Sequence, residues 1–419
     1  MKKYIFYTLY PLLLIVFIFA PCAFSDTIKY PNVKIKRAIS IHNVMNWPKM
    51  DIKDGTPRYQ WPPFSTSDSV LWMTDLHRLK QAGFDTIRLT VGLGIFLSAN
   101  ETQQLQLDAI LIDRVKTILG TGLNVIVDFH PITQDPRYPP IAFTRGPGEP
   151  LVEAFRALLV RTASNLSKLP QDNVVLEILN EPATLDWSKG EASLWYETQQ
   201  SYFDSIRQAA PELTIIVTGC CTISGLELTT FDPSNLPDKN VYFTFHYYAP
   251  HAFTHQGVVE RKNELSPINF FKNVPFPISN EKFNEISKQA YDAFEKVAFA
   301  SNVIDRMKGK ERLKTYLERL KEYSTPEDID LGIQKTLDWA KRHGIPASQL
   351  FLGEFGVMRD VEPNSRREWL KTVVNAVERR GMAWGYWLLS SPVKGMELVI
   401  DPKTRLFDSI TLDALGMDK

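Results

Sequence analysis

The stretch VVLEILNEP, residues 174–182, is a short apolar segment that ends in a carboxylate. Its first six residues are mostly β-branched or aliphatic, which favours a buried β-strand. Glu181 and Pro182 follow directly, and proline helps to end a strand because it has no backbone N–H to donate. Glu181 is therefore expected at the end of a strand, where it is either a solvated charge or a proton donor.

Seven more segments of this kind occur between residues 35 and 392. Helical patterns lie between them, as in residues 325–344, where Thr325 is a predicted N-cap and Pro326 the first helical position. Strands that alternate with helices predict an α/β fold with a parallel sheet, and eight strands close a (β/α)₈ TIM barrel. The further predicted strands are KRAISI (36–41), DTIRLTV (85–91), NVIVDF (124–129), TIIVTG (214–219), VYFTFH (241–246), LFLGEF (350–355) and AWGYWLL (383–389).

An open, doubly wound sheet is the alternative fold. It predicts a glycine-rich phosphate loop after the first strand. The sequence there is SIHNVMNWP, residues 40–48, which contains no glycine. We therefore expect the barrel.

The composition is that of a globular protein with a large core. Of 419 residues, 44% are hydrophobic and 23% are charged, and the formal net charge is zero. A neutral chain lacks the basic surface that binds nucleic acid or an acidic membrane, so neither is an expected partner. Cys220 and Cys221 are adjacent, and neighbouring cysteines rarely bridge, so no disulfide framework is expected. Without a Cys or His cluster at zinc spacing, we predict neither a metal site nor a cofactor.

The N-terminal residues have the pattern of an export signal. Lys2 and Lys3 precede an apolar run at residues 4–20, and small residues follow it. This order predicts a signal peptide over residues 1–25, cleaved after Ser25, and a secreted or periplasmic protein. An uncleaved membrane anchor is the alternative, which Pro11 weakens because it interrupts the run. We expect residues 26–419 to form one domain and a monomer, without stable membrane association after cleavage.

The connection between the sixth and seventh predicted strands is unusually long. It exceeds a simple crossover by roughly eighty residues. Residues 280–302 and 308–323 within it read as charged amphipathic helices. We therefore predict a helical insertion over residues 258–324, which is either a solvated structural element or a wall of the substrate site.

Polar and aromatic residues gather at the predicted strand ends. Reactive groups of a barrel collect at the C-terminal ends of its strands. Singly, each of these side chains has a structural explanation, but together they predict one site. Two carboxylates that face one cavity are what cleavage of a glycosidic bond requires, because one must donate a proton and the other must be ionised. The candidates are His42, Asn43, Arg88, His130, Asn180, Glu181, His246, Tyr248, Glu354 and Trp387.

Several motifs resemble glycoside hydrolase family 5, the cellulase-like family of retaining barrels. They are LEILNEP (176–182), FLGEFG (351–356), VDFH (127–130) and FHYYAP (245–250), together with Arg88. The resemblance covers about residues 35–392, apart from the insertion. It implies an O-glycosyl hydrolase that acts on a polysaccharide or oligosaccharide through a covalent glycosyl-enzyme.

The resemblance also implies a role for each matching residue. Glu181 corresponds to the acid/base and Glu354 to the nucleophile. We expect Arg88 to keep Glu354 ionised, and Glu354 to keep the pKa of Glu181 raised. A retaining mechanism predicts carboxyl groups about 5–5.5 Å apart. Asn180 corresponds to the residue that binds the 2-hydroxyl of the sugar, and Arg88 and Tyr248 to groups that hold the nucleophile. His246 corresponds to the partner of the acid/base, and His130 to a residue that binds the same sugar. Trp387 corresponds to the aromatic floor under that sugar, which a cis peptide often follows.

Tryptophans near the strand ends are candidates for binding further sugars, because aromatic rings stack on the C–H faces of sugars. They are Trp47, Trp187 and, with packing as an equal alternative, Trp61. Trp195 is expected in the core. Glu177 is expected to pair with a base inside the barrel, because an unpaired buried carboxylate is costly.

The first strand and the insertion depart from the usual pattern of the family, and both border the predicted cleft. A β-1,4-glucan is the default substrate. A β-mannan, a β-1,3-glucan and a glycolipid head group are alternatives, as is transglycosylation on the same residues. A non-catalytic glycan-binding barrel would require the loss of one carboxylate, and both are present.

Overall fold

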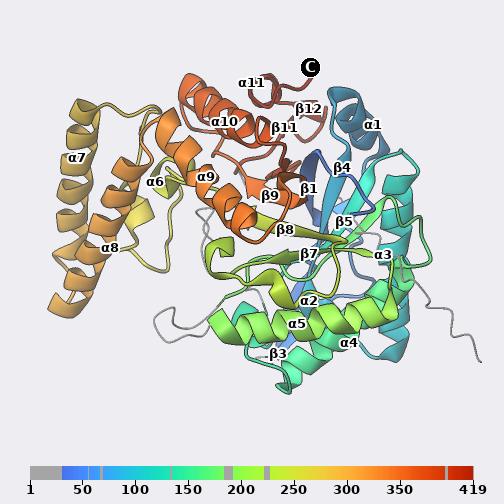
Figure 1. Ribbon diagram of the computed structural model, residues 1–419. Helices are drawn as coiled ribbons and strands as arrows, with labels where there is room; N and C mark the ends of the chain where they lie inside the picture. Colours follow the sequence, from blue (N-terminus) through green and yellow to red (C-terminus); the bar gives the residue numbers. More distant parts are fainter. Residues whose placement is uncertain are drawn as a thin grey trace, which may run out of the picture.

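Eight parallel strands close into a barrel that helices surround (Figure 1). The computed structural model describes residues 31–54, 56–66, 69–132, 135–183, 192–220, 227–391 and 395–418. The barrel strands are β1 (Arg37–Met45), β4 (Thr86–Val91), β5 (Asn124–Phe129), β6 (Val174–Glu177), β7 (Thr214–Thr218), β8 (Val241–His246), β9 (Leu350–Phe355) and β10 (Ala383–Tyr386). Each pairs with its neighbour in this order, and β1 closes the ring by pairing with both β4 and β10. The predicted (β/α)₈ barrel is confirmed.

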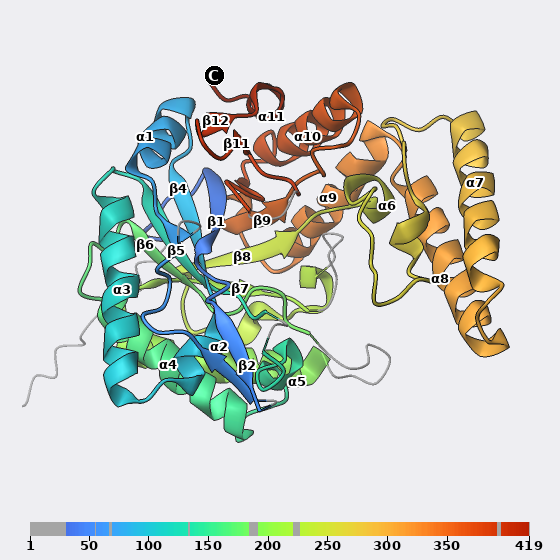
Figure 2. The same ribbon diagram turned by 180° about the vertical axis from the view of Figure 1, so that it is seen from behind.

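Helices cover the outside of the barrel, as Figures 1 and 2 show from opposite sides. They are α1 (Met73–Ala82), α2 (Leu93–Ser98), α3 (Glu101–Leu119), α4 (Pro150–Leu166), α5 (Ala192–Ala209), α6 (His251–Thr254), α7 (Asn280–Ala298), α8 (Val303–Glu322), α9 (Pro326–Arg342), α10 (Pro363–Glu378) and α11 (Ser409–Ala414). Short 3₁₀ helices are η2 (Pro140–Phe143), η4 (Glu227–Thr230), η5 (Pro233–Asn235), η6 (Pro267–Phe270) and η7 (Ala347–Gln349).

The strands are buried on both faces, which explains why they read as apolar runs rather than as alternating ones. One cluster of the core lies inside the N-terminal half of the barrel and includes Ala38, Ile126, Val175 and Phe351. The large cluster lies between the strands and the helices. The polar residues of the predicted site therefore occupy the other end of the barrel interior.

Helix caps account for several boundaries. Thr325 caps α9 through a capping box with Asp328, as the sequence predicts. The helix α3 starts at Glu101, where Asn100 and Gln103 form a second capping box. The helix α1 starts at Met73 without a side-chain cap.

The chain between β8 and β9 forms α6, η6, α7, α8 and α9. The helices α7 and α8 pack against each other as a hairpin to one side of the barrel (Figures 1 and 2). The two helices predicted in this connection are therefore present. The interpretation of residues 258–324 as an insertion stays a prediction.

Three features were not predicted. Two small antiparallel hairpins lie outside the barrel, β2 (Met50–Lys53) with β3 (Thr56–Tyr59) and β11 (Val399–Asp401) with β12 (Leu406–Phe407). Cys220 is disulfide-bonded, to a cysteine outside the described residues, so the expectation that this cysteine stays unbridged is wrong.

None of the helices in the described part of the chain is long and apolar enough to traverse a bilayer. The predicted signal peptide, residues 1–25, lies outside the described residues.

Candidate active site

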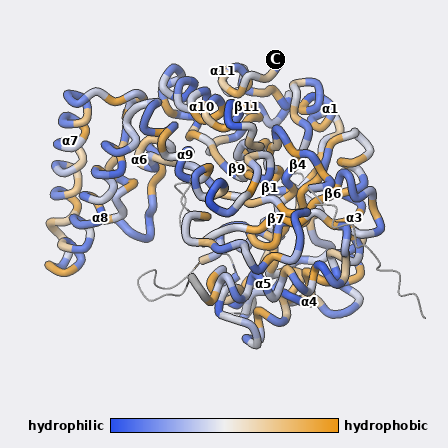
Figure 3. Tube along the Cα trace, in the orientation of Figure 1, coloured by the Kyte–Doolittle hydropathy of each residue, from blue (hydrophilic) through white to orange (hydrophobic). Residues whose placement is uncertain are grey.

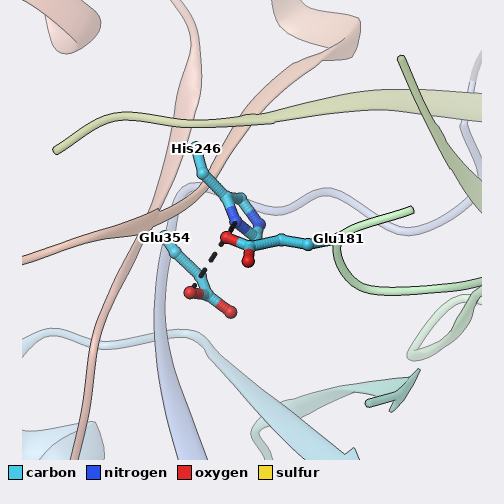
Figure 4. A group of neighbouring side chains, drawn as sticks. All are labelled: Glu181, His246 and Glu354. Carbon is cyan, nitrogen blue, oxygen red and sulfur yellow. Dashed lines mark hydrogen bonds and ion pairs between the residues drawn. The ribbon is translucent and has the colours of Figure 1, made fainter. Parts of the chain in front are cut away.

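Glu181, His246 and Glu354 converge at the C-terminal ends of the barrel strands (Figure 4). Glu354 lies in β9 and His246 at the end of β8, and both are buried. Glu181 follows β6, which ends at Glu177, so that its side chain reaches the rim and is 45% exposed. One oxygen of each carboxylate and one ring nitrogen of His246 lie within 4.8 Å of one another. The two carboxylates thus lie side by side at one end of the barrel, with Glu181 open to solvent.

Glu354 is fixed by donors on both of its carboxylate oxygens. Arg88 Nη1 donates to Oε1 at 2.6 Å, and the hydroxyl of Tyr248 donates to Oε2 at 3.1 Å. His246 Nδ1 lies 3.7 Å from the same Oε2. The contacts expected of Arg88 and Tyr248 are present, and they leave the carboxylate little freedom to rotate.

Arg88 is the centre of a buried ion-pair network beneath the site. Its guanidinium contacts Glu177 through two hydrogen bonds of 2.7 and 2.9 Å, and Asp128 at 3.0 Å. It also donates to Asn180 Oδ1 at 2.9 Å. Burial alone would lower the pKa of Arg88, but the neighbouring carboxylates raise it well above the usual value. The guanidinium is therefore a permanent cation.

Glu177 pairs with a base inside the barrel, as predicted. Burial raises the pKa of Glu177 above its usual value, although Arg88 acts in the opposite direction. The carboxyl lies deeper than Glu354 and contacts no open surface. It supports Arg88 and does not reach the cleft.

The pKa of Glu181 differs from the expectation. Desolvation by the surrounding rim raises it, but a 2.8 Å hydrogen bond from His246 Nδ1 and the charge of that ring outweigh desolvation, so the pKa lies below its usual value. Burial lowers the pKa of His246, yet Glu354 and Glu181 together raise it to about 9. The prediction that Glu354 holds up the pKa of Glu181 is therefore wrong for the free protein, because the nearest charge to Glu181 is a histidine cation.

An aromatic group forms one wall of the site. Trp387 stacks on His130 with ring centroids 5.5 Å apart, and His42 packs edge-on to Trp387 at 4.8 Å. Trp47 Nε1 donates to His42 Nε2 at 2.5 Å, which assigns the ring proton to Nδ1, beside Thr90 Oγ1 at 2.9 Å. Burial lowers the pKa of His42, consistent with this neutral tautomer. The peptide bond between Trp387 and Leu388 is cis, as the resemblance implied.

His130 links this wall to Asn180. Its Nδ1 lies 2.9 Å from Asp128 Oδ2, and its Nε2 lies 3.3 Å from Asn180 Nδ2. A proton on Nδ1 leaves Nε2 to accept from the amide of Asn180. Because Asn180 Oδ1 already accepts from Arg88, its amide orientation is set from both ends.

The other predicted residues are placed more variably. Trp47 is exposed at the rim, and Trp61 is partly exposed and donates to Gln106. Asn43 follows His42 in β1 but lines a small cavity with Trp72 and Arg405. Trp195 is buried in the core, as expected. Trp187 lies outside the described residues.

Two histidines beside the site were missed by sequence reasoning. His251 and His255 stack with centroids 3.8 Å apart, and the ring of His255 packs edge-on to Tyr248 at 5.1 Å. Burial lowers the pKa of His251 to about 4 and that of His255 to about 3, so both are neutral. The signal was available, because residues 246–255 hold three histidines directly after a strand.

The carboxylate–histidine trio also has the composition of a cation site. Each residue offers one ligand atom, and no other such group occurs among the residues that the structure describes. Its atoms already bond one another, Arg88 and Tyr248. A cation would have to displace the Arg88 charge from Glu354, so the trio fits a proton-transfer pair better than a metal centre.

Comparison with known proteins identifies the family. Residues 51–392 match the family model described as Cellulase (glycosyl hydrolase family 5). Endoglucanase 3 of Fibrobacter succinogenes is 22% identical over 334 residues, covering 75% of this chain but 45% of that protein, so the chain spans less than half of it. Endoglucanase C of Acetivibrio thermocellus is 21% identical over 328 residues, covering 76% of this chain and 84% of that protein.

The solved structures agree at the level of the fold. The structure of Thermotoga maritima Cel5A in complex with mannotriose superposes with a TM-score of 0.61 at 20% identity, covering 92% of this chain and 98% of that one. At such identity the likeness shows the barrel and nothing finer. The family model extends over more than half of the chain, and the protein belongs to glycosyl hydrolase family 5.

Proposed function

We propose that this protein is a retaining endo-β-1,4-glucanase. The observation that carries the proposal is the approach of Glu181 and Glu354, whose nearest oxygens lie within 4.8 Å. Retaining glycosidases place their carboxyl groups about 5–5.5 Å apart, whereas inverting enzymes leave about 6.5–9.5 Å for a water molecule. The short separation supports direct attack by a carboxylate.

In the first step, Glu354 attacks the anomeric carbon as the glycosidic bond breaks. Arg88 and Tyr248 hold it in the orientation for attack. Glu181 protonates the departing oxygen, and a covalent glycosyl-enzyme remains. In the second step, Glu181 takes a proton from water, the water oxygen attacks the anomeric carbon, and Glu354 leaves as a carboxylate.

The proton for the first step is stored by the pair of His246 and Glu181. In the free protein it resides on His246, whose pKa of about 9 depends on the negative charge of Glu354. Attack by Glu354 consumes that charge, so the pKa of His246 falls at the moment when the leaving oxygen needs a proton. The proton then passes along the 2.8 Å hydrogen bond to Glu181 and on to the sugar. The second step returns it.

The sugar at the point of cleavage is proposed to lie on Trp387, with Asn180 at its 2-hydroxyl and His130 beside it. The fixed amide of Asn180 supports this, because a site that hydrogen-bonds one hydroxyl discriminates by its position. Trp47 extends the aromatic surface outward. The two curated relatives are named endoglucanases, and the Thermotoga maritima protein has been solved with both cellobiose and mannotriose. A β-1,4-glucan is the substrate that these likenesses favour.

Two variants test the catalytic roles. Glu354→Gln should abolish turnover, and Glu181→Ala should recover activity with azide on a substrate with a good leaving group, yielding a β-glycosyl azide. Glu378→Gln is the matched control, because Glu378 pairs with Arg37 at the opposite end of the barrel. Near-normal rates for Glu354→Gln, with the fold intact by circular dichroism, would refute the assignment.

A substrate panel tests the specificity separately. Carboxymethyl cellulose, mixed-linkage β-glucan, β-mannan, xylan and aryl β-glycosides should be assayed with product lengths recorded. Highest kcat/KM on β-1,4-glucan with internal cleavage is expected. Dominant activity on mannan would replace the substrate but leave the two catalytic carboxylates in place.

We also propose that the enzyme acts outside the cytoplasm as a monomer. The pattern of residues 1–25 supports export. N-terminal sequencing of protein recovered from the medium or periplasm should begin at Asp26, and sedimentation should give the monomer mass. An intact Met1 on a membrane fraction would indicate the anchor instead.

A further inference from the structure

The free end of the α7–α8 hairpin exposes a group of large apolar side chains. Phe299 is 85% exposed, Val303 72%, Met307 67% and Ile304 64%, and Val297 lies beside them. We call these five residues the hairpin tip. Figures 1 and 2 show this end projecting from the barrel, and Figure 3 colours it as hydrophobic. Isolated exposed apolar residues are ordinary, but five within eleven positions form a patch of the kind that marks a binding surface.

The hairpin tip does not serve the packing of the hairpin. The helices α7 and α8 hold together through other residues, which are buried, such as Phe294, Ala298 and Leu313. The start of α8 is capped by Asn302, whose side chain accepts from the backbone of Asp305. The fold is thus complete without the exposed apolar side chains, whose contact with water is unfavourable.

Basic residues surround the tip. From residue 296 to residue 314 the chain contains six basic and two acidic residues, although the whole chain is neutral. Glu295 pairs with Arg306 and Lys310, which balances part of this charge. Lys296 and Lys308, which directly precede and follow residues 297–307 in the sequence, are exposed. The surface is therefore complementary to an anionic partner.

The shape and size of the tip favour a lipid surface over a protein. A stable protein interface buries about 800 Å² on each partner, which five side chains at the end of two helices do not supply. An interfacial membrane contact needs less, because apolar side chains enter only about 5–10 Å into the boundary between head groups and acyl chains, while Lys and Arg bind anionic head groups. A convex end with a phenylalanine matches that requirement.

We propose that the hairpin tip docks the protein on the surface of an anionic membrane. This peripheral contact differs from the expected absence of membrane association, and it depends neither on a spanning helix nor on the activity of the barrel. The apolar side chains supply insertion, and the surrounding lysines and arginines select membranes with negative head groups.

Vesicle binding tests the proposal. The full chain is floated with vesicles of phosphatidylcholine alone or with phosphatidylglycerol. The triple variant Phe299→Ser, Ile304→Ser, Met307→Ser should bind the anionic vesicles about tenfold or more weakly. Leu105→Ser combined with Leu331→Ser, at similarly exposed positions on α3 and α9, is the matched control and should bind like the wild type. Residues 1–30 contribute equally to every variant, so the difference reports the tip.

Hydrogen exchange localises the contact. Peptides covering residues 297–307 should gain protection with anionic vesicles and lose it in the triple variant. Equal binding of the triple variant and the wild type, or no gain of protection at the tip, would overturn the proposal. A monomer–dimer equilibrium that the triple variant abolishes in the absence of lipid would also overturn it, because the tip would then bind a second copy of the chain. Circular dichroism and turnover of a soluble substrate confirm that the variants fold.

Discussion

Replacement of His246 by asparagine separates the charge of this residue from its hydrogen bond. The amide of the new side chain would stand in for Nδ1 of His246, which lies 2.8 Å from Glu181 Oε1, but it carries no proton to release. Desolvation lowers the pKa of His246, and Glu354 and Glu181 raise it from 6.5 to about 9. This rise corresponds to roughly 3 kcal/mol of interaction between the imidazolium and its neighbours.

The basic limb of the pH profile should report this interaction. In the wild type, kcat/KM is expected to fall near pH 9, where the pair of His246 and Glu181 loses its stored proton. In His246→Asn the pair retains only the carboxyl of Glu181, so the basic limb should move to lower pH by about 2 units or more. At pH 8, about one unit above the shifted limb, the variant should therefore lose about tenfold or more in kcat/KM, and considerably less at pH 5.

The assay is kcat/KM from pH 4 to 10 on two aryl β-cellobiosides with different leaving groups. A phenyl leaving group requires the proton, whereas dinitrophenolate does not, so only the phenyl substrate should show the shifted limb. His77→Asn, at an exposed position on α1, is the control. A basic limb that stays in place in His246→Asn, or that moves equally with both substrates, would refute the proposal that His246 holds the proton for the first step.

The positive charge of His246 should also contribute to the free energy of unfolding. The folded-state pKa of His246 lies above its unfolded value, so its contribution is fully present below pH 6.5 and is lost as the pH rises through about 9. The difference in unfolding free energy between wild type and His246→Asn should thus shrink by up to about 3 kcal/mol from pH 6 to pH 10. Urea unfolding at both pH values measures it.

Three further predictions concern single contacts. Tyr248→Phe removes the hydroxyl that donates to Glu354 at 3.1 Å, a hydrogen bond to a charged group of about 1.5–3 kcal/mol, so kcat/KM should fall about 10- to 100-fold in steady-state assays. Thr325→Ala removes the capping box of α9 and should cost about 1 kcal/mol in urea unfolding without a change in kcat. EDTA should leave kcat unchanged, because the atoms of Glu181, His246 and Glu354 that could bind a cation already bond one another, Arg88 and Tyr248. A loss of activity that a divalent cation restores would show a metal site instead.

The sequence predicted the barrel well because burial on both faces makes its strands continuous apolar runs. The predicted bounds of β5, β8 and β9 match the structure, while β6 and β10 end earlier than their apolar runs. The rim begins where pairing stops, so Asn180, Glu181 and Trp387 lie beyond the strands, where their side chains are free to face the cleft. An apolar pattern records burial, and burial continues past the assigned end of each strand, as do single backbone hydrogen bonds from Ile178, Asn180 and Trp387 to the neighbouring strands.

The electrostatics of the site were less predictable, because they depend on distances between residues far apart in the sequence. The partners of Arg88 lie 40 to 266 positions away, and the order of charges around Glu181 was misjudged for this reason. Sequence placed His246 and Glu354 near Glu181, but it did not show that His246 lies between the charges. The stacked histidines beside Tyr248 were missed because they follow the strand in a short helix instead of lying in it.

The distribution of protons follows from the arrangement of cations. Four carboxylates, Asp128, Glu177, Glu181 and Glu354, surround two cations, Arg88 and His246. Arg88 contacts the three buried carboxylates, and His246 lies between Glu181 and Glu354. Burial raises the pKa of Glu177, which pairs with Arg88 inside the barrel and takes no part in the proposed reaction. The negative charge beneath the site is thus balanced by Arg88, while the cation beside Glu181 stays available as the source of the proton.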